Sequence, residues 1–461
     1  MFRKTVILSG FTLAFLMTQG QATTYYLDST SGNNFLAGAQ TAAPWRDLRY
    51  ASSMLYHPGD QILLKAGSVW QGQTLNIATT EESDEPIVVG SYGEGNQPVL
   101  DGLNGVESPV NLSSASNVVI SGLTIQSSKV LISIVGGHNN TVRNCTLVNA
   151  GTFATSVSNS PAFTFSNNSY ASTGTHALQG QVLHAVGTGS GIKVIGNKLT
   201  FNSASKGAIG LYVVDISNAE VANNVIHGGG EPIGIKAVHR SVSGTNVHDN
   251  AIYDTITGPG DGEAIEFTGW PGTGYTVSGK VHHNFIRGIP STTNGIAVRQ
   301  SRNVICYNNI IVGHMWNAAF HWTVSSTGGV FYGNTIHGTT FGFAIYSGSG
   351  GVIRNNIVSG TGVAIAVSRA SVSEDYNIFY SAGSRGVSKG GHSNTSNPRF
   401  VSSSPSGPLD VKLQSGSPAI HTGAGLGSSY ALALDPASTR FPCTMLNQGT
   451  YGWDRGAFGH K

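Results

Sequence analysis

The chain has 461 residues and a formal net charge of +2; 62 residues are glycine, and only 10% are charged. Helical bundles and coiled coils carry far more charge, and the near-neutral balance argues against a nucleic-acid partner, which needs a basic surface. Because 39% of the residues are hydrophobic, the chain can build a large core and does not read as a disordered, low-complexity sequence.

The first 22 residues have the pattern of a secretory signal peptide. Arg3 and Lys4 precede an apolar stretch at 5–17, and the small residues Gly20 and Ala22 stand before the expected cleavage site. The apolar stretch is shorter than the about 20 residues of a membrane anchor. We therefore predict a secreted or periplasmic protein that keeps no membrane span after cleavage.

The three cysteines do not form a disulfide framework, because an odd and sparse set cannot cross-link a long secreted chain. Cys145 and Cys306 fall at apolar positions of the repeat described next, and we expect buried thiols there. The sequence assigns no role to Cys443.

An asparagine followed one residue later by an apolar residue recurs along the chain, which is the mark of a repeat protein. One repetition spans 21 to 34 residues, and Gly122 holds the same place one repetition earlier. The recurring residues are Asn144, Asn168, Asn197, Asn224, Asn250, Asn284, Asn309, Asn334, Asn356 and Asn377. We expect these side chains to form a structural ladder and to take no part in catalysis.

Short apolar segments such as GIKAV, AIEF and GIAV lie between these asparagines and are separated by Gly, Asn and Ser. Strands of this length, stacked in parallel with Asn at each turn, predict an all-β fold: a right-handed parallel β-helix of about ten or eleven coils. The segment WRDLRYASSMLY at 45–56 predicts a short capping helix. We expect a signal peptide at 1–22, an N-terminal cap with the first strands at 23–100, regular coils at 101–397, and a C-terminal cap at 398–461 that folds over the other end.

Motifs in both caps carry a family resemblance. YYLDSTSGNN, PWRDL and PGDQILLKAG near the N-terminus, and SGSPAIHTGAG and DRGAFG near the C-terminus, resemble the caps of secreted bacterial right-handed β-helix proteins that act on polysaccharides. The resemblance implies a polysaccharide as partner. Because that superfamily includes lyases, hydrolases, epimerases and phage spikes, the activity has to be argued from the site.

Alternate side chains of a strand face outward, so the stacked strands predict two outward columns. The first contains Lys236, Glu266, Ala297, Ala319 and Ala344, and the second contains Val238, Thr268, Arg299, His321 and Tyr346. Successive coils lie about 4.8 Å apart. Arg299, His321 and Tyr346 are therefore expected to form one strip, with small residues beside it that leave room for a sugar.

That strip suits β-elimination on a uronic acid. Removing the proton next to a sugar carboxylate needs a cation to stabilise the enolate-like intermediate, a base and an acid. Arg299 is the candidate for the cation, and His321 and Tyr346 are the candidates for base and acid. Three exposed polar residues on a solvent-facing strip are the structural alternative.

The same region resembles the lyase family that includes alginate lyases and chondroitinase B. Its Gly-Glu-x-Ile strand is matched by 262–265, and Arg299, four residues before Asn303-Val304, stands at the position of the family's catalytic Lys. His321 stands at the position of its catalytic Arg. The family's acidic calcium ligands are replaced by Thr293-Asn294-Gly295, so no cofactor is firmly predicted and calcium stays open.

A glycoside hydrolase is the main alternative, since it needs two carboxylates across the scissile bond, about 5 to 9.5 Å apart. Asp261, Glu263 and Glu266 are close in sequence, and Asp249 and Asp254 lie one coil earlier. Glu263 and Asp261 could instead cap the entry of the strand. Glu266 faces outward by alternation and is the best single carboxylate in either scheme.

Three other groups of residues support further alternatives. Polar residues that follow the Asn positions, His227, Tyr253, Arg287 and His337, read as turn-flanking surface residues. VHDN and VHHN suggest a zinc site through His248, His282 and His283, although no metal-binding spacing is present. A non-catalytic carbohydrate-binding solenoid could use Trp270, Trp316 and Trp322, of which Trp322 faces inward by alternation.

The sequence therefore predicts a monomeric polysaccharide-degrading enzyme, a uronate lyase first and a glycoside hydrolase second, with an acidic polysaccharide as substrate. The predicted catalytic residues are Arg299, His321, Tyr346 and Glu266. The predicted substrate-binding residues are Lys236, Glu263, Trp270 and His239. No metal ligands are predicted.

Overall fold

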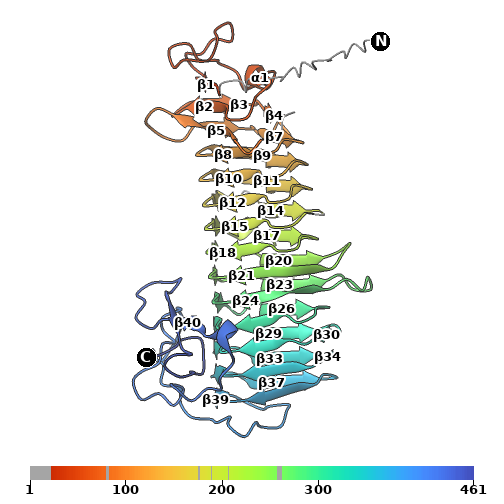
Figure 1. Cartoon of the computed structure of the whole chain (residues 1–461), viewed down its shortest axis with the longest axis vertical. Coiled ribbons are helices and arrows are strands. Elements are labelled where there is room, and N and C mark those ends of the chain that lie inside the picture. Colours follow the sequence, from red (N-terminus) through yellow and green to blue (C-terminus); the bar gives the residue numbers. More distant parts are fainter. Residues whose placement is uncertain (1–21, 79–82, 175–176, 188, 206, 257–261) are drawn as a thin grey trace, which may run out of the picture.

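The computed structural model describes residues 22–461 except 79–82, 175–176, 188, 206 and 257–261. Nearly all of the predicted signal peptide and Asp261 lie outside the described residues. The described chain forms a long stack of parallel strands, a right-handed β-helix of about 12 turns (Figure 1). The predicted fold class is confirmed. The turns outnumber the predicted ten or eleven because strands of the N-terminal cap join the same stack.

The first face of the solenoid is a sheet of 14 parallel strands in the described residues. In stacking order they are β1 (Thr24–Leu27), β2 (Gln61–Lys65), β5 (Ile87–Tyr92), β8 (Val118–Ser121), β10 (Thr141–Arg143), β12 (Thr164–Ser166), β15 (Lys193–Ile195), β18 (Glu220–Ala222), β21 (Val242–His248), β24 (Val277–His282), β27 (Ile305–Tyr307), β31 (Val330–Tyr332), β35 (Gly351–Arg354) and β38 (Val372–Asp375).

The second face is a run of mostly three-residue strands that follow the Asn positions. It stacks β3 (Val69–Gln71), β6 (Val99–Asp101), β9 (Thr124–Val135), β11 (Thr146–Ser158), β13 (Ser169–Ala171), β16 (Lys198–Thr200), β19 (Val225–His227), β22 (Ala251–Tyr253), β25 (Phe285–Gly288), β28 (Ile310–Gly313), β32 (Thr335–His337), β36 (Ile357–Ser359) and β39 (Ile378–Tyr380).

The third face carries the longest regular strands. It stacks β4 (Leu75–Ile77), β7 (Val110–Ser113), the long strands β9 and β11 that run on from the second face, β14 (Gln181–Val186), β17 (Ile209–Val214), β20 (Glu231–Ala237), β23 (Glu263–Gly269), β26 (Asn294–Arg299), β29 (Ala318–Thr323), β33 (Phe341–Tyr346) and β37 (Val363–Ser368). The remaining short elements are α1 (Leu48–Ala51), η1 (Ser203–Ser205), η2 (Ser428–Tyr430), β30 (Ser326–Thr327), β34 (Gly348–Ser349), β40 (Leu432–Leu434) and β41 (Met445–Asn447).

The core runs along the axis and follows the predicted alternation. On β29 the side chains of Phe320 and Trp322 are buried in the core, whereas His321 and Thr323 are only half-buried on the outer face. The inward direction predicted for Trp322 is confirmed. Cys145 and Cys306 are buried free thiols, as predicted, and Cys443 is also buried.

The asparagine ladder is confirmed from Asn168 to Asn377. Each Asn Nδ2 donates to the Oδ1 of the next Asn, as between Asn197 and Asn224 at 2.9 Å, and a second bond joins Asn197 Nδ2 to a backbone carbonyl at 2.9 Å. The prediction was wrong at Asn144, which adopts a positive φ of 53° beside the ladder. Cys145 fills that rung, and its backbone N–H donates to Asn168 Oδ1 at 3.0 Å.

The N-terminal and C-terminal segments contact different parts of the stack. The predicted helix is reduced to α1, because Leu48 is fully buried while Leu55, expected on the same apolar side, is 56% exposed. The C-terminal segment lies against the flank of the solenoid (Figure 1), where Leu434 and Phe458 share a cluster with Phe285 of the second face. No helix among the described residues is long and apolar enough to span a membrane.

Candidate functional site

Five charged residues gather on the outer face of the third sheet, and we call them the charge cluster. Arg299 donates from Nη2 to Glu263 Oε1 at 2.5 Å and from Nη1 to Glu266 Oε1 at 2.9 Å. Lys236 pairs with Glu231 Oε1 at 2.8 Å and also with Glu266. The three carboxylates are buried, whereas the Arg299 side chain is 21% exposed. The cluster therefore presents the Arg299 guanidinium to solvent, whereas Lys236 and the carboxylates are buried.

The backbone explains how two glutamates of one strand reach the same face. Ala264 and Ile265 both belong to the core, so the alternation shifts by one residue at this corner. Glu263 and Glu266, three residues apart, thus both extend to Arg299. A neighbouring glycine is required for space: a Cβ on Gly234 would stand 2.1 Å from Glu231 Oε1.

His321 and Tyr346 lie beside the charge cluster. Their ring centroids are 5.9 Å apart in an edge-to-face arrangement. Burial and the nearby Arg299 guanidinium lower the pKa of His321 to about 4. His321 is therefore neutral at pH 7, as a general base must be.

The register corrects the predicted columns. One outer column contains Tyr212, Gly234, Glu266, Ala297, His321 and Ala344, and the next contains Lys236, Thr268, Arg299 and Thr323. Lys236 and His321 thus each stand in the other column than predicted. Ala319, predicted to face outward, is in the core, because the backbone bends at the start of β29 and two successive residues, Ala319 and Phe320, face inward.

The structure still brings Glu266, Arg299, His321 and Tyr346 to one outer face. The predicted open space over the alanines is wrong, since Ala297 and Ala344 are both completely buried. The long side chains around the two alanines cover them. A ligand would meet the ends of Arg299, His321 and Tyr346.

The predicted substrate-binding residues fall in two places. Lys236 and Glu263 are buried in the charge cluster, and Glu263 lies beneath Arg299. His239 and Trp270 are on loops that follow β20 and β23, and the backbone N–H of Trp270 donates to Ala237 O at 2.8 Å. The side chains of His239 and Trp270 are largely exposed, so these two can reach a ligand along the edge of the sheet.

The carboxylates considered for a hydrolase are dispersed. Asp249 Oδ2 is 2.7 Å from His248 Nδ1, and Asp254 forms a two-point ion pair with Arg287. Neither takes part in the charge cluster. Of the described members of the predicted set, Glu263 and Glu266 belong to it, and Asp261 lies outside the described residues.

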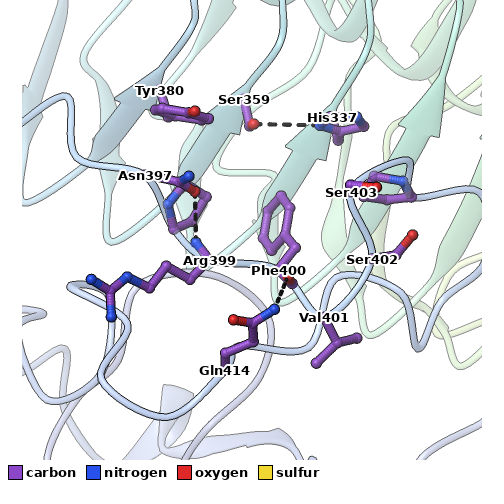
Figure 2. A pocket seen from close by; sticks show the side chains of 12 residues that line it. His337, Ser359, Tyr380, Asn397, Arg399, Phe400, Val401, Ser402, Ser403 and Gln414 are labelled. Carbon is purple, nitrogen blue, oxygen red and sulfur yellow. Dashed lines mark hydrogen bonds between the residues drawn. The ribbon is translucent and has the colours of Figure 1, made fainter.

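A separate cavity of about 440 Å³ lies between the second face and the C-terminal segment. Figure 2 shows His337, Ser359 and Tyr380 from strands β32, β36 and β39 on one side and Phe400 opposite them. His337 belongs to the predicted turn-flanking column, in which His227 stacks on Tyr253 and Arg287 lies over the same ring. No carboxylate of the described residues lines this cavity, so it lacks the carboxylate pair of a glycoside hydrolase.

The metal alternatives do not fit the described residues, among which no group of three or more His, Cys, Asp and Glu side chains is arranged to hold a metal ion. His282 Nδ1 is 2.7 Å from His283 Nδ1, and its Nε2 is 2.8 Å from Asn246 Oδ1. For calcium, the guanidinium of Arg299 already supplies the cation between Glu263 and Glu266.

Two members of the site were not identified from the sequence. Glu231 and Asn294 occupy the strand-entry position that Glu263 holds on β23, and each stands two residues before an isoleucine. The recurrence of a polar residue before x-Ile on three successive coils was the available signal. This recurrence identifies a column of polar side chains only when the bend of the backbone at the start of each strand is known.

Comparisons with known proteins support the architecture. A lacto-N-biosidase of Bifidobacterium longum subsp. longum is 36% identical over 95 residues, which are 20% of this chain and 6% of that protein. The solved PL6 family alginate lyase AlyGC is 13% identical with a TM-score of 0.53, over 79% of this chain and 54% of that one. The solved GH136 lacto-N-biosidase of Eubacterium ramulus is 14% identical with a TM-score of 0.43, over 77% and 67%.

The alginate lyase structure shares the β-helix fold. The sequence match to the lacto-N-biosidase spans only a small part of this chain and of that relative. The family model described as "Right handed beta helix region" matches residues 73–199, 108–280 and 182–373, well over half of the chain. The chain belongs to this right-handed β-helix family.

Proposed function

We propose that the protein is a polysaccharide lyase that cleaves a uronic-acid-containing chain by β-elimination. The observation that carries the proposal is Arg299, whose guanidinium is held by Glu263 and Glu266 and stands beside the neutral imidazole of His321. A fixed guanidinium of this kind can donate its remaining N–H groups to a sugar carboxylate and so stabilise the enolate-like intermediate. His321 and Tyr346 supply the groups for hydrogen bonding and proton transfer.

The carboxylates favour the lyase over the hydrolase. A glycoside hydrolase needs two carboxyl groups that contact the glycosidic bond or the attacking water. Glu263 and Glu266 are both buried, and each has a cation as partner. In this arrangement the carboxylates position Arg299 and Lys236, and the partly exposed Arg299 is the cation that meets the substrate.

A glycoside hydrolase remains the second candidate because of one observation: three glutamates, Glu231, Glu263 and Glu266, lie in one cluster. The short sequence match to a lacto-N-biosidase points the same way. This candidate requires Arg299 to move so that the carboxylates become accessible.

The product distinguishes the two reactions. The purified protein would be incubated with a panel of acidic and neutral polysaccharides, and products followed by ultraviolet absorbance and mass spectrometry. A lyase leaves a carbon–carbon double bond at the new non-reducing end, whereas a hydrolase adds one water per cut and gives no absorbance change. Water addition on every cleaved substrate would reject the lyase, and binding without cleavage would favour a carbohydrate-binding solenoid.

We further infer that the enzyme works outside the cytoplasm as a monomer. The basic and apolar start of the sequence supports export. A long polymer cannot enter the cell, so its cleavage belongs outside the membrane.

A further inference from the structure

Asn294 links the charge cluster to His321. It is the first residue of β26, is buried, and pairs with Glu263 on one side and Ala318 on the other. Its side chain therefore lies between a glutamate of the cluster and the strand that carries His321.

The orientation of the Asn294 amide is fixed by groups that have a single hydrogen-bonding role. The backbone N–H of Ala318, which can only donate, lies 3.3 Å from Asn294 Oδ1. Glu263 Oε1, which also accepts from Arg299, lies 3.0 Å from Asn294 Nδ2. Asn317 Nδ2 adds a further donor to Oδ1 at 2.9 Å. The NH2 group of Asn294 therefore faces Glu263 and His321.

This orientation decides where His321 carries its proton. Asn294 Nδ2 lies 3.4 Å from His321 Nδ1, and because Nδ2 donates, Nδ1 has to accept. A neutral imidazole has one donor and one acceptor nitrogen. Its proton is then on Nε2, and the nitrogen free to meet a substrate is a donor.

We propose that Asn294 is a positioning residue that holds His321 in the Nε2-protonated neutral tautomer, so that His321 donates a hydrogen bond to the sugar carboxylate and leaves proton transfer to Tyr346. The inference rests on the proposed lyase function. A neutral imidazole that acts as a hydrogen-bond donor is an established way to stabilise an enolate-like charge. Arg299 supplies the positive charge to the same carboxylate.

Tyr346 acts as both the base and the acid of the proposed reaction. Tyr346 enters the step as a phenolate, its phenol proton having passed to solvent, and its oxygen takes the proton from the carbon beside the carboxylate. The electron pair of that C–H bond becomes the carbon–carbon double bond. The bond from the neighbouring carbon to the leaving oxygen breaks, and the Tyr346 phenol returns the proton to that oxygen. The enzyme ends the cycle in its starting protonation state, and His321 has exchanged no proton.

The tautomer is measured directly by 15N NMR of the full-length protein at pH 7, with His321 assigned from the His321→Gln variant. We expect a protonated Nε2 and an unprotonated Nδ1 in the native protein, and a mixture of tautomers in Asn294→Ala. A native spectrum with Nδ1 protonated would overturn the proposal. This measurement needs no substrate, so it separates failure of this inference from failure of the proposed lyase activity.

The donor role is tested by kinetics on a polysaccharide that the native enzyme cleaves. His321→Gln keeps a side-chain N–H donor but has no basic nitrogen, and we expect kcat within about tenfold of the native value. His321→Ala removes the donor and should lower kcat by about 10² or more. Equal losses in the two folded variants would show that His321 acts as a base and would overturn the proposal.

Discussion

His321 lies opposite Ala297 on the neighbouring strand, two residues before the position at which Arg299 pairs with Thr323. The imidazole of His321 and the guanidinium of Arg299 therefore lie diagonally across the neighbouring strands β29 and β26. Neighbouring strands lie about 4.8 Å apart, so a single bound sugar unit can contact both side chains.

The diagonal arrangement predicts different effects for the two residues of β29 that face outward. His321→Ala should lower the rate of polysaccharide cleavage by about 10² or more. Thr323→Ala, on the same strand and face, should leave the rate within about threefold, since Thr323 has no role in the proposed reaction. Initial rates followed by ultraviolet absorbance would check this pair, and equal losses would contradict the assignment.

Arg299 should also support the fold. Arg299→Ala leaves Glu263 and Glu266 buried without this cation, which should lower the free energy of unfolding by about 3 to 5 kcal/mol. The exposed Arg302 on the same coil offers the control, and Arg302→Ala should change it by less than about 0.5 kcal/mol. Urea unfolding followed by circular dichroism measures both, and a stable Arg299→Ala protein would argue against a tightly coupled cluster.

Acid should destabilise the protein through His282. Burial lowers the pKa of His282 from its usual 6.5 to about 2, so between these values the unfolded chain binds a proton that the folded chain does not. The stabilisation is complete above pH 6.5 and is lost as pH falls toward 2. Unfolding of the native protein and of His282→Asn at pH 7.5 and pH 4.5 would check this; the variant should lose less stability on acidification.

The asparagine ladder makes a positional prediction. Asn250 Nδ2 donates to Val221 O and to Asn284 Oδ1, each at 2.9 Å, so Asn250→Ala leaves buried groups without partners and should cost about 2 kcal/mol or more. Asn144→Gly should be neutral within about 0.5 kcal/mol, because Asn144 lies beside the ladder in a conformation that glycine adopts readily. Melting temperatures of the two variants would decide whether the ladder begins after Asn144.

Much of the fold can be predicted from the sequence, because the same pattern of Asn and short apolar segments recurs in every coil. The Asn series predicts the stack, and alternation correctly separates Phe320 and Trp322 from His321. Alternation does not predict which residues of neighbouring strands pair. An extra inward residue at the start of a strand, Ala264 on β23 and Ala319 on β29, shifts the columns of outward side chains, and the sequence of one strand does not show this shift.

The candidate site could be predicted only in part for the same reason. Glu266 and Arg299 are outward by alternation, but their ion pair depends on side-chain reach across coils. In the sequence, Asn294 is noted only where the related lyases have acidic calcium ligands. Its importance depends on the backbone N–H of Ala318, a partner that lies on another coil and that no motif encodes.

The ladder also has an electrical direction. From Asn168 to Asn356 every ladder amide donates to the Asn of the next coil, as between Asn309 and Asn334 and between Asn356 and Asn377. Aligned amide dipoles add up, as the peptide dipoles of an α-helix do. The positive end falls at Asn377, where Nδ2 lies 2.9 Å from the buried carboxylate of Glu374. A negative charge thus terminates a dipole that is built from side chains and runs through the solenoid.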